Sequence, residues 1–414
     1  MTDICYPKSA KLLSVDDARQ RIRQAISGID DHQRIDLGQA LGRILAKSVT
    51  SPIDIPPQRN AAMDGYAFSS ADIAENTAFT LKMVGTSWAG KPFEGTAGRK
   101  QCVRIFTGAV VPDFADSVIA QEQVYVVDHD ITFPSDTRPG KNIRAAGSDV
   151  RKHETLLDAG KKLRPNDLGL LAAAGVDSIE VYRQLKIGFF STGDELTPIG
   201  TPLQAGQIYD SNRYLLAGLL NDSAYAVTDL GVIRDDRLQL EETLADAAKN
   251  FDMLLSTGGA SVGEADFVNQ ALEKYGEVNF WKLAVKPGKP LTFGKIGNCW
   301  FFGLPGNPVA VLVTFAQFVK PALDQLAGAP AHATIQLLAR CESALRKSPG
   351  RQEYQRGILR QTSAGEFSVK AAGPQDSHQL KVASLANCFI VLDKDCAGVD
   401  EGQMVIVEPF DTRI

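Results

Sequence analysis

A regular alternation of apolar runs and amphipathic segments between residues 185 and 328 most constrains the fold of this chain. The apolar run at 185–190, for example, is followed by an amphipathic segment at 211–222. Strands that alternate with helices of this length form a mainly parallel sheet with helices on both faces. We therefore predict a doubly wound, mainly parallel α/β domain, and we expect residues 307–328 to form its longest helix.

The segments that flank this region have a different sequence pattern. They hold short alternating runs separated by glycine and proline, which predict β-rich modules. We expect the C-terminal module to be barrel-like. The fold class is thus a multidomain α/β protein with four units: a discontinuous N-terminal linking domain of helices (1–51 with 151–184), a small β-rich domain (52–150), the α/β domain (185–330) and a C-terminal β domain (331–414).

Two amphipathic helices are expected in the linking domain. Ser14 is a favourable N-cap for a helix over 15–27, and a second helix is predicted over 164–176. Their apolar faces consist of Val15, Ala18, Ile22 and Ile26 in the first helix, and of Leu168, Leu171 and Ala172 in the second.

Composition and charge disfavour several classes of protein. The chain has 44 Lys+Arg and 49 Asp+Glu, a formal net charge of −5, so it lacks the basic balance of a general nucleic-acid binder. No apolar run reaches the roughly 18 residues of a membrane span, and the polar N-terminus is unlike a signal peptide. The six cysteines form no C-x-x-C pair, which argues against a zinc or iron–sulfur site. We expect a cytoplasmic protein without nucleic-acid or membrane partners.

Five polar loops follow the predicted strands of the α/β domain. In an open α/β sheet, ligands bind beyond the carboxyl ends of the strands, because the loops and helix N-termini there direct backbone N–H groups outward. We expect one edge of the sheet to carry all five loops: 191–196, 234–236, 257–266, 286–290 and 304–308.

The Thr-Gly-Gly-Ala-Ser sequence in the third loop has the composition of a phosphate cradle. Gly258 and Gly259 permit close approach of a ligand to the backbone. Thr257 and Ser261 offer hydroxyl groups ahead of the next helix. The alternative is a plain strand-to-helix turn. A Walker A sequence and a dinucleotide-binding glycine motif are both absent, so a Walker ATPase and a Rossmann dehydrogenase are disfavoured.

Three of the loops concentrate acidic residues. Two like charges ~4 Å apart repel by about 4 kcal/mol at an effective dielectric constant near 20, so their convergence requires a cation. Mg²⁺ suits this role because it takes oxygen ligands, usually one or two carboxylates with substrate phosphates and waters. Alternatively, each acid is a solvated loop residue or a charge that favours a helix N-terminus. The acids are Asp194, Glu195, Asp235, Asp236, Glu264 and Asp266.

Lys282, Lys286 and Lys289 lie close together around two prolines and a glycine. This arrangement fixes the backbone while it directs ammonium groups at an anion; a solvated lysine face is the alternative. The 304–308 turn offers free N–H groups as a second anion site, or it only stiffens the chain. Outside the α/β domain, Asp64 lies in an Asp-Gly pair, which by itself signals a turn.

Nine motifs, taken together and in this order, resemble those of the molybdopterin molybdenumtransferase family, which includes the MoeA proteins and the E domain of gephyrin. The resemblance runs from about residue 12 to the C-terminus. The motifs are NAAMDGYA, RIFTGAVVP, GKNIRAAGSD, STGDEL, GQIYDSN, GVIRDD, TGGASVGEAD, WKLAVKPGKP and GLPGNPV.

The resemblance implies an elongated homodimer whose α/β domain is of the molybdopterin-binding type. It implies an enzyme that completes molybdenum cofactor synthesis. The substrates would be adenylated molybdopterin and molybdate: the pyrophosphate bond is cleaved, molybdate enters the dithiolene, and Mo-molybdopterin and AMP are released. Mg²⁺ is the implied cofactor, and molybdopterin adenylyltransferase and molybdoenzymes are possible partners.

The resemblance also assigns site residues, from more than one module, so the site is expected to span domains and the dimer interface. The catalytic positions are Asp64, Asp149, Glu195, Asp235, Asp266, Lys282 and Lys286, with Glu195, Asp235 and Asp266 as metal ligands. The binding positions are Thr107, Thr192, Gly193, Thr257, Gly258, Gly259, Ser261, Lys289, Pro305 and Pro308. For the molybdate oxyanion we expect Lys286, Lys289, Arg351 and His378.

Two other functions are compatible with these motifs. The first is a non-catalytic scaffold that binds molybdopterin or a partner protein; the intact acids favour the enzyme. The second is the adenylyltransferase of the same pathway, which the flanking β modules disfavour. The sequence departs from many relatives at Thr257 and Ala260, but the hydroxyl at Thr257 is retained.

Overall fold

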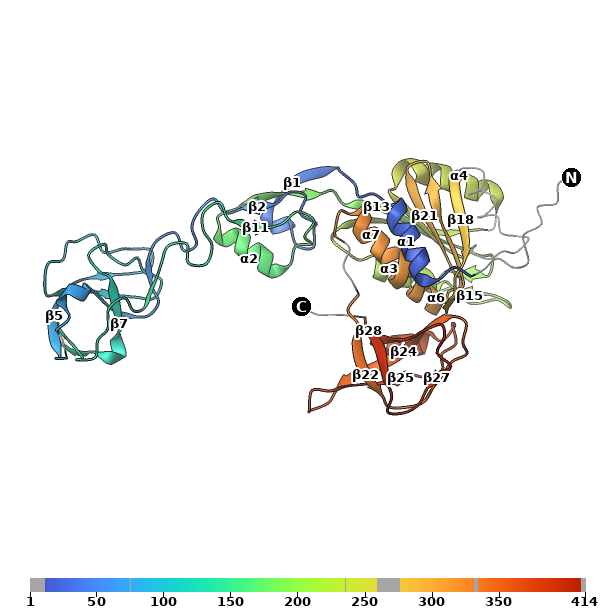
Figure 1. Cartoon of the computed structure of the whole chain (residues 1–414). Coiled ribbons are helices and arrows are strands. Elements are labelled where there is room, and N and C mark those ends of the chain that lie inside the picture. The colour runs from blue at the N-terminus through green and yellow to red at the C-terminus, as the bar shows by residue number, and fades with distance from the viewer. Residues whose placement is uncertain (1–11, 75, 235, 259–275, 331–333, 411–414) are drawn as a thin grey trace.

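The computed structural model describes residues 12–410 apart from 75, 235, 259–275 and 331–333. Figure 1 shows an elongated molecule. A small β sheet, blue to cyan, lies at one end and is joined through a middle segment to the α/β sheet. A C-terminal barrel, in red, lies beside the α/β part.

Six strands form the sheet of the α/β part: β13 (Leu185–Thr192), β16 (Tyr225–Ile233), β17 (Met253–Thr257), β18 (Gly276–Lys282), β20 (Pro290–Ile296) and β21 (Cys299–Leu304). Their order is β16-β13-β17-β21-β20-β18. The first four run parallel, which confirms the prediction of a mainly parallel sheet. β20 is antiparallel to β21 because only Gly297 and Asn298 join them, and so short a link cannot cross the sheet.

Helices cover both faces of this sheet, as predicted. Alternate residues of β13 point to opposite faces, so Phe189 belongs to one apolar core and Phe190 to another. The first core contains residues of α3 (Ser211–Leu219) and of the long helix over 308–326. The second contains residues of α4 (Arg237–Asn250). The sheet is therefore doubly wound.

The long helix consists of α6 (Pro308–Thr314), the π-helical turn η4 (Phe315–Val319) and α7 (Lys320–Leu326). Among the helices that the structure describes, it is the one with the length and apolar composition of a membrane span. However, 67% of its apolar window is buried inside the protein. It is accordingly the core helix of the α/β part.

α1 (Val15–Ala25) begins after Ser14, whose hydroxyl accepts a hydrogen bond from the Asp17 backbone N–H at 3.1 Å. The predicted N-cap is confirmed, but the helix ends before residue 27 because Ile26 has an extended backbone. Its apolar stripe joins the core of the α/β part beside α7. The middle segment therefore begins after α1, although the sequence grouped this helix with it.

The middle segment has a small core between two strand pairs and one helix. β1 (His32–Asp36) pairs with β12 (Ser178–Tyr182), and β2 (Val49–Thr50) pairs with β11 (Thr155–Leu157). α2 (Pro165–Ala173) covers them, so the expectation of a purely helical linking domain was wrong. Leu171 of α2 is buried as predicted, whereas Ala172 is exposed.

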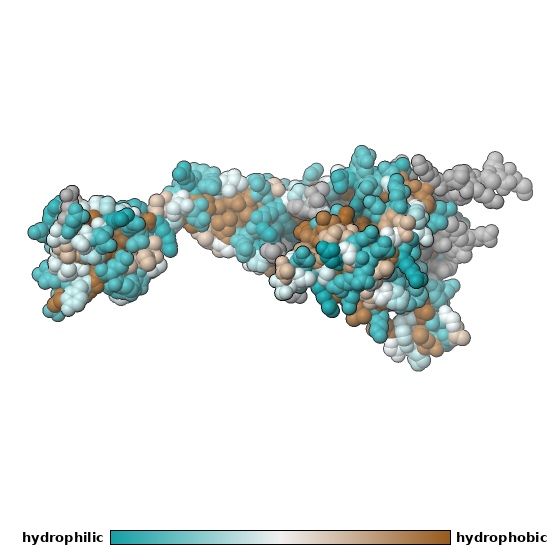
Figure 2. All heavy atoms as spheres, turned by 60° about the horizontal axis from the view of Figure 1, so that its bottom comes forward, coloured by the Kyte–Doolittle hydropathy of each residue, from teal (hydrophilic) through white to brown (hydrophobic). Residues whose placement is uncertain are grey.

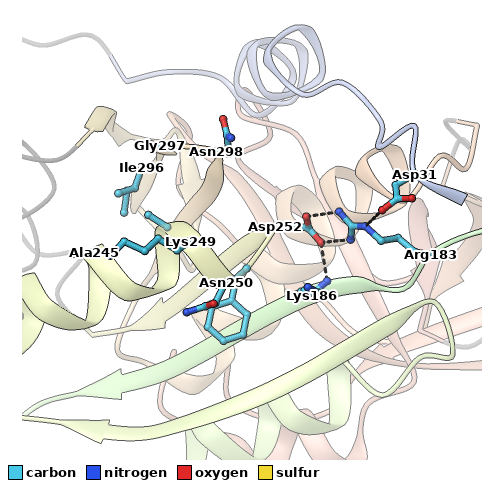
Figure 3. A pocket seen from close by; sticks show the side chains of 12 residues that line it. Asp31, Arg183, Lys186, Ala245, Lys249, Asn250, Asp252, Ile296, Gly297 and Asn298 are labelled. Carbon is cyan, nitrogen blue, oxygen red and sulfur yellow. Dashed lines mark hydrogen bonds and ion pairs between the residues drawn. The ribbon is translucent and has the colours of Figure 1, made fainter.

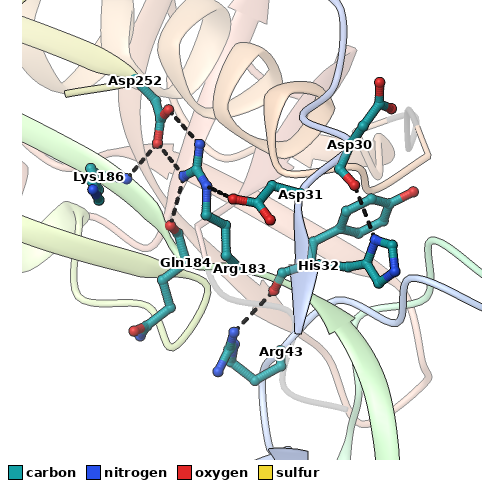
Figure 4. A network of polar contacts seen from close by, with 9 residues as sticks. Asp30, Asp31, His32, Arg43, Arg183, Gln184, Lys186 and Asp252 are labelled. Carbon is teal, nitrogen blue, oxygen red and sulfur yellow. Dashed lines mark hydrogen bonds and ion pairs between the residues drawn. The ribbon is translucent and has the colours of Figure 1, made fainter. Parts of the chain in front are cut away.

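Ion pairs fix the middle segment to the α/β part (Figure 4). Arg183, between β12 and β13, donates from Nη1 and Nη2 to the two carboxylate oxygens of Asp252 at 2.6 and 2.8 Å. Its Nε donates to Asp31 Oδ2 at 3.1 Å. The buried Arg43 donates from Nη2 to the Tyr182 carbonyl at 2.9 Å. The planar Arg183 guanidinium thus holds this joint in one orientation, whereas the Arg43 hydrogen bond lies within the middle segment.

The small sheet confirms the first expected β-rich module. Its strands are β4 (Gly65–Phe68), β5 (Phe79–Ser87), β6 (Gln101–Ile105), β7 (Ser117–Ala120), β8 (Tyr125–Val127) and β9 (Asp130–Phe133), in the order β7-β4-β6-β5-β9-β8. Its entry and exit segments run side by side through an Ile55–Val150 bridge and the pair β3 (Asn60–Ala61) and β10 (Ile143–Arg144). We call these paired segments, 51–61 and 143–154, the neck.

The C-terminal strands close into a five-stranded barrel, as expected. They are β22 (Leu337–Cys341), β24 (Gln352–Gln361), β25 (Phe367–Ala371), β26 (Cys388–Leu392) and β28 (Met404–Pro409). The barrel closes because β24 pairs with both β25 and β26. A strand from the α/β part, β19 (Val285–Lys286), adds to β24 in parallel. The shorter elements are η1 (Leu37–Gln39), η2 (Ser70–Asp72), η3 (Gln121–Gln123), β14 (Leu196–Thr197), β15 (Ile208–Tyr209), β23 (Leu345–Arg346), α8 (Leu380–Leu385) and β27 (Gly398–Val399).

Gly65→Ala tests the packing of the small sheet. A Cβ at Gly65 would lie 1.8 Å from the Ile119 carbonyl oxygen, so β4 and β7 must separate. We expect a loss of about 1–3 kcal/mol in the free energy of unfolding, measured by denaturant titration with hydrogen exchange of β4 and β7. Gly98→Ala is the control, because a Cβ there comes no closer than 3.8 Å to another residue. Equal exchange in the two variants would contradict the expected clash.

Candidate functional site

The predicted loops meet at one edge of the α/β sheet. In the parallel registers, Thr192 lies beside Ile233, and Thr257 lies beside Leu304. The carboxyl ends of β13, β16, β17 and β21 are therefore together. β18 ends at the same edge, at Lys282, because it runs parallel to β21 on the far side of β20. The expectation of a shared edge is confirmed.

A cavity of about 530 Å³ lies between this edge and the barrel, and we call it the edge cavity. The loop after β18 and the turn before α6 form its α/β side, and the segments before β24 and α8 form its barrel side. Lys286, Lys289 and Arg351 line it together with one acid, Asp376. Among the described residues that line the edge cavity, the ionisable groups therefore carry a net positive charge, which suits an anionic ligand.

Lys286 is tied to the barrel. Its Nζ lies 2.9 Å from Oε1 of Glu353, which is buried. The pair follows from the parallel register of β19 on β24, which sets the two residues side by side. Lys289 is exposed and makes no ion pair within the described part of the chain. Lys282 is also exposed, at the end of β18, but it does not line the edge cavity.

Pro305 and Pro308 shape the turn before α6. Pro305 lines the edge cavity. Pro308 is the first residue of α6, where its missing N–H breaks no helical hydrogen bond. The next N–H, of Val309, donates to the Ser377 carbonyl of the barrel at 3.2 Å. The turn is thereby anchored to the barrel wall of the cavity.

The loop after β13 is shaped by Gly193, which has a φ of +147°. A Cβ at this position would lie 2.5 Å from Glu195 Oε2, so glycine leaves room for the glutamate side chain. Thr192 is nearly buried, whereas Glu195 is exposed at the edge. Of these three predicted site residues, Glu195 is the one presented to solvent.

The predicted phosphate cradle is described only in part. Thr257 is buried, and its hydroxyl donates to Ser191 Oγ at 3.0 Å, so it is turned into the sheet. Gly258 has a φ of +84° and lines the edge cavity; a Cβ there would lie 2.4 Å from the Thr192 carbonyl oxygen. Gly259 and Ser261 lie outside the described residues.

Among the three predicted magnesium ligands, Glu195 lies in the described part of the chain, whereas Asp235 and Asp266 lie outside it. The described residues contain no group of three or more His, Cys, Asp or Glu side chains placed to hold a metal ion. The exposed carboxylate of Glu195 nevertheless fits Mg²⁺, which usually takes one or two carboxylates and completes its shell with phosphate oxygens and water.

Asp64 precedes β4 in the small sheet and is held by Thr107. Its Oδ1 accepts hydrogen bonds from the Thr107 hydroxyl at 2.7 Å and from the Thr107 backbone N–H at 2.8 Å. These bonds, with a smaller contribution from the charge of Arg104, lower the pKa of Asp64 below its ordinary value. The structure therefore brings these two predicted residues together and holds Asp64 as a carboxylate.

Asp149 lies in the neck and is exposed. Its backbone N–H donates to the Ile55 carbonyl at 3.0 Å. Within one chain, the neck and the small sheet lie away from the edge of the α/β sheet (Figure 1). A single chain therefore does not bring Asp64 and Asp149 to the edge cavity.

A second cavity, of about 830 Å³, lies at the opposite edge, where β13 and β17 begin (Figure 3). The paired Arg183 and Asp252 form part of its wall, and Lys186 contributes its backbone N–H to Asp252 at 2.8 Å. The charges of Arg183 and Asp252 neutralise each other, because the two side chains form an ion pair. The edge cavity, with its surplus of cations, is the better candidate for chemistry.

Comparisons with known proteins agree with this arrangement. Three family models match along the chain: the MoeA N-terminal region (domains I and II) over 13–175, a probable molybdopterin binding domain over 188–325, and the MoeA C-terminal region (domain IV) over 339–410. The molybdopterin molybdenumtransferase of Haemophilus influenzae is 42% identical over 405 residues, which cover 96% of this chain and 99% of that protein. The chain belongs to the molybdopterin molybdenumtransferase family.

Other members of the molybdopterin molybdenumtransferase family support the assignment. The Nostoc protein of that name is 34% identical and matches 95% of this chain and 93% of its own length. The crystal structure of a molybdopterin biosynthesis MoeA protein from Pyrococcus horikoshii has a TM-score of 0.83 at 28% identity, and the match covers 97% of this chain and all of that one. The family resemblance and the expectation of an enzyme are confirmed.

Sequence reasoning identified only part of the barrel's contribution to the edge cavity. It suggested Arg351, which lines the edge cavity, and His378, which follows the lining residue Ser377. It did not identify Glu353 or Gln375. The one local signal was the Gly373-Pro374 pair, which marks a turn before this loop.

Thr107→Val should raise the pKa of Asp64 toward its ordinary value, because the hydroxyl donor is lost while the backbone donor remains. A carboxylate with a depressed pKa stabilises the fold above its unfolded pKa, and this stability is lost as pH falls through the folded value. The variant should therefore be less stable than the unmodified protein at neutral pH, and this difference should disappear as pH falls through the folded pKa of Asp64. Carboxyl carbon chemical shifts of Asp64, followed against pH, measure the change.

Thr107→Ser keeps the hydroxyl and serves as the matched control. Its Asp64 titration should follow that of the unmodified protein. Identical titration of Asp64 in the valine and serine variants would contradict the role assigned to this hydrogen bond.

Proposed function

We propose that this protein is a molybdopterin molybdenumtransferase that cleaves adenylated molybdopterin and inserts molybdate into the dithiolene, releasing AMP. The observation that carries the proposal is the edge cavity. Its cations come from two separate parts of the fold, Lys286 and Lys289 from the α/β part and Arg351 from the barrel. Such a cavity suits a substrate that bears phosphate and a reaction that consumes a second oxyanion.

Cleavage of a pyrophosphate bond places growing negative charge on the phosphate oxygens. Preorganised cations lower the barrier because they stabilise that charge without reorganising during the reaction. Lys286, held by its ion pair, and the exposed Lys289 are suited to this role. Mg²⁺ bound by Glu195 with Asp235 and Asp266 would neutralise further charge on the phosphates.

We assign molybdate to the barrel side of the edge cavity. Molybdate is a compact dianion, and Lys286, Lys289 and Arg351 offer three cations around one volume. The Arg351 guanidinium presents its N–H groups in a planar fork, which suits oxyanion recognition. His378 lies next to the lining residue Ser377 in sequence and is the fourth candidate.

We further propose that the active site is shared between the subunits of a homodimer. Figure 2 shows apolar side chains on the surface of the middle segment, and its core leaves Leu37, Leu168 and Leu170 only half buried. A partner subunit packed on this segment would cover them. It would also offer its Asp64 and Asp149 to the edge cavity of the first subunit.

A cytoplasmic location, exchange of cofactor with molybdopterin adenylyltransferase and transfer to molybdoenzymes complete the proposal. The alternative function is a non-catalytic molybdopterin-binding scaffold. The two differ in their need for charged groups, since a scaffold keeps its function without a reactive carboxylate or ammonium.

Asp64→Asn and Lys289→Met should each reduce turnover of adenylated molybdopterin by about 100-fold. The assay follows AMP release in the presence of Mg²⁺ and molybdate. Asp113→Asn is the control for Asp64, because Asp113 is an exposed acid of the same part of the chain. Turnover unchanged in both variants would contradict the enzyme and favour the scaffold.

Mixed dimers test whether the site is shared. Consider a dimer of one Asp64→Asn chain and one Lys289→Met chain. If each site takes Asp64 from one subunit and Lys289 from the other, one of the two sites carries both substitutions and the other carries neither. We therefore expect co-expressed and separately tagged mixed dimers to regain turnover that neither pure dimer has. Failure to regain turnover, with mixed dimers isolated intact, would place both residues in one chain's site.

A further inference from the structure

Arg356, on β24 of the barrel, is the largest of the completely buried side chains in the described part of the chain, with 1% of its surface exposed. Its Nη2 donates to the carbonyl oxygens of Asp376 at 3.1 Å and Pro374 at 3.4 Å. Its backbone N–H donates to Gln375 Oε1 at 2.7 Å, and its carbonyl accepts from Gln375 Nε2 at 3.2 Å. The loop over 373–377 is thus bound to β24 by both the side chain and the backbone of Arg356.

This loop is the barrel wall of the edge cavity, since Gln375, Asp376 and Ser377 line it. Its far end is held by the hydrogen bond from the Val309 N–H to the Ser377 carbonyl. Arg356 itself does not line the cavity. Any effect of Arg356 on a bound anion must therefore pass through the loop.

Glu353 lies three residues before Arg356 on the same strand, on its opposite face, and holds the other wall. It is 4% exposed, and its carboxylate forms an ion pair with the Lys286 ammonium at 2.9 Å. Two residues of β24 therefore fix the cationic side chain and the loop that both line the edge cavity. The charge of Glu353 also acts on the Arg356 guanidinium.

Stability alone does not account for this arginine. A buried guanidinium is costly unless its donors are bonded, and an apolar side chain of similar volume often gives a more stable core. The Nε of Arg356 has no hydrogen-bond partner among the described residues. The two carbonyl groups that Arg356 does hold belong to the cavity loop, which indicates that their placement is its role.

We propose that Arg356 and Glu353 are positioning residues through which the barrel sets the width and charge of the edge cavity. Arg356 fixes the 373–377 loop, and Glu353 fixes the Lys286 ammonium. The inference rests on the proposed function only in taking molybdate as the anion that enters.

Arg356→Met removes the Nη2 donors and keeps the length of the side chain. We expect faster hydrogen exchange of the 373–377 amides and about tenfold weaker binding of molybdate by calorimetry, as for loss of one supporting charged hydrogen-bond donor. In the full reaction, KM for molybdate should rise while kcat changes little. Arg360→Met is the matched control, because Arg360 is exposed on the same strand.

Glu353→Gln provides a second, nearly isosteric variant in case Arg356→Met does not fold. It should weaken molybdate binding without loosening the 373–377 loop, because it frees Lys286 alone. Loop exchange and molybdate affinity equal to those of the Arg360→Met control in both variants would overturn the inference. If the unmodified protein binds no molybdate, the proposed function fails, and loop exchange in Arg356→Met still decides whether Arg356 positions the loop.

Discussion

The pairing of β19 with β24 is the contact on which the candidate site depends. Two residues that belong in sequence to the α/β part complete the sheet of the barrel, so hydrogen bonds fix the register between the two parts. That register sets Lys286 beside the buried Glu353. Together with the hydrogen bond from the Val309 N–H to the Ser377 carbonyl, this pairing holds the two walls of the edge cavity beside each other.

The small sheet lies at the other end of the molecule and is attached to it in a different way. Asp64 is preorganised locally by Thr107, within a sheet that reaches the rest of the chain only through the neck. The bidentate Arg183–Asp252 pair fixes the middle segment to the α/β part. The middle segment is therefore fixed to the α/β part, whereas the small sheet lies away from the edge cavity of its own chain.

The features that the sequence predicted correctly are those that short stretches of sequence determine. The alternation of apolar runs and amphipathic segments predicted the parallel sheet and the edge where its polar loops meet. Ser14 predicted the start of α1. Arg351 was suggested from the sequence, but the role of Glu353 could not be predicted, because Glu353 meets Lys286 across 67 residues of sequence and no nearby motif marks it. Similarly, the stripe of α1 indicated an apolar face but not which core it joins. A short stretch of sequence does not indicate which distant strand it pairs with or which apolar core its side chains join.

The neck gives the small sheet the topology of an insertion. The chain leaves and re-enters the middle segment at adjacent points, since Ile55 and Val150 are bridged. A module attached in this way can be shortened, enlarged or replaced in evolution while the remaining strands keep their connections, because its two junctions already lie a strand spacing apart. The size and reach of the small sheet can thus change independently of the cation-lined cavity.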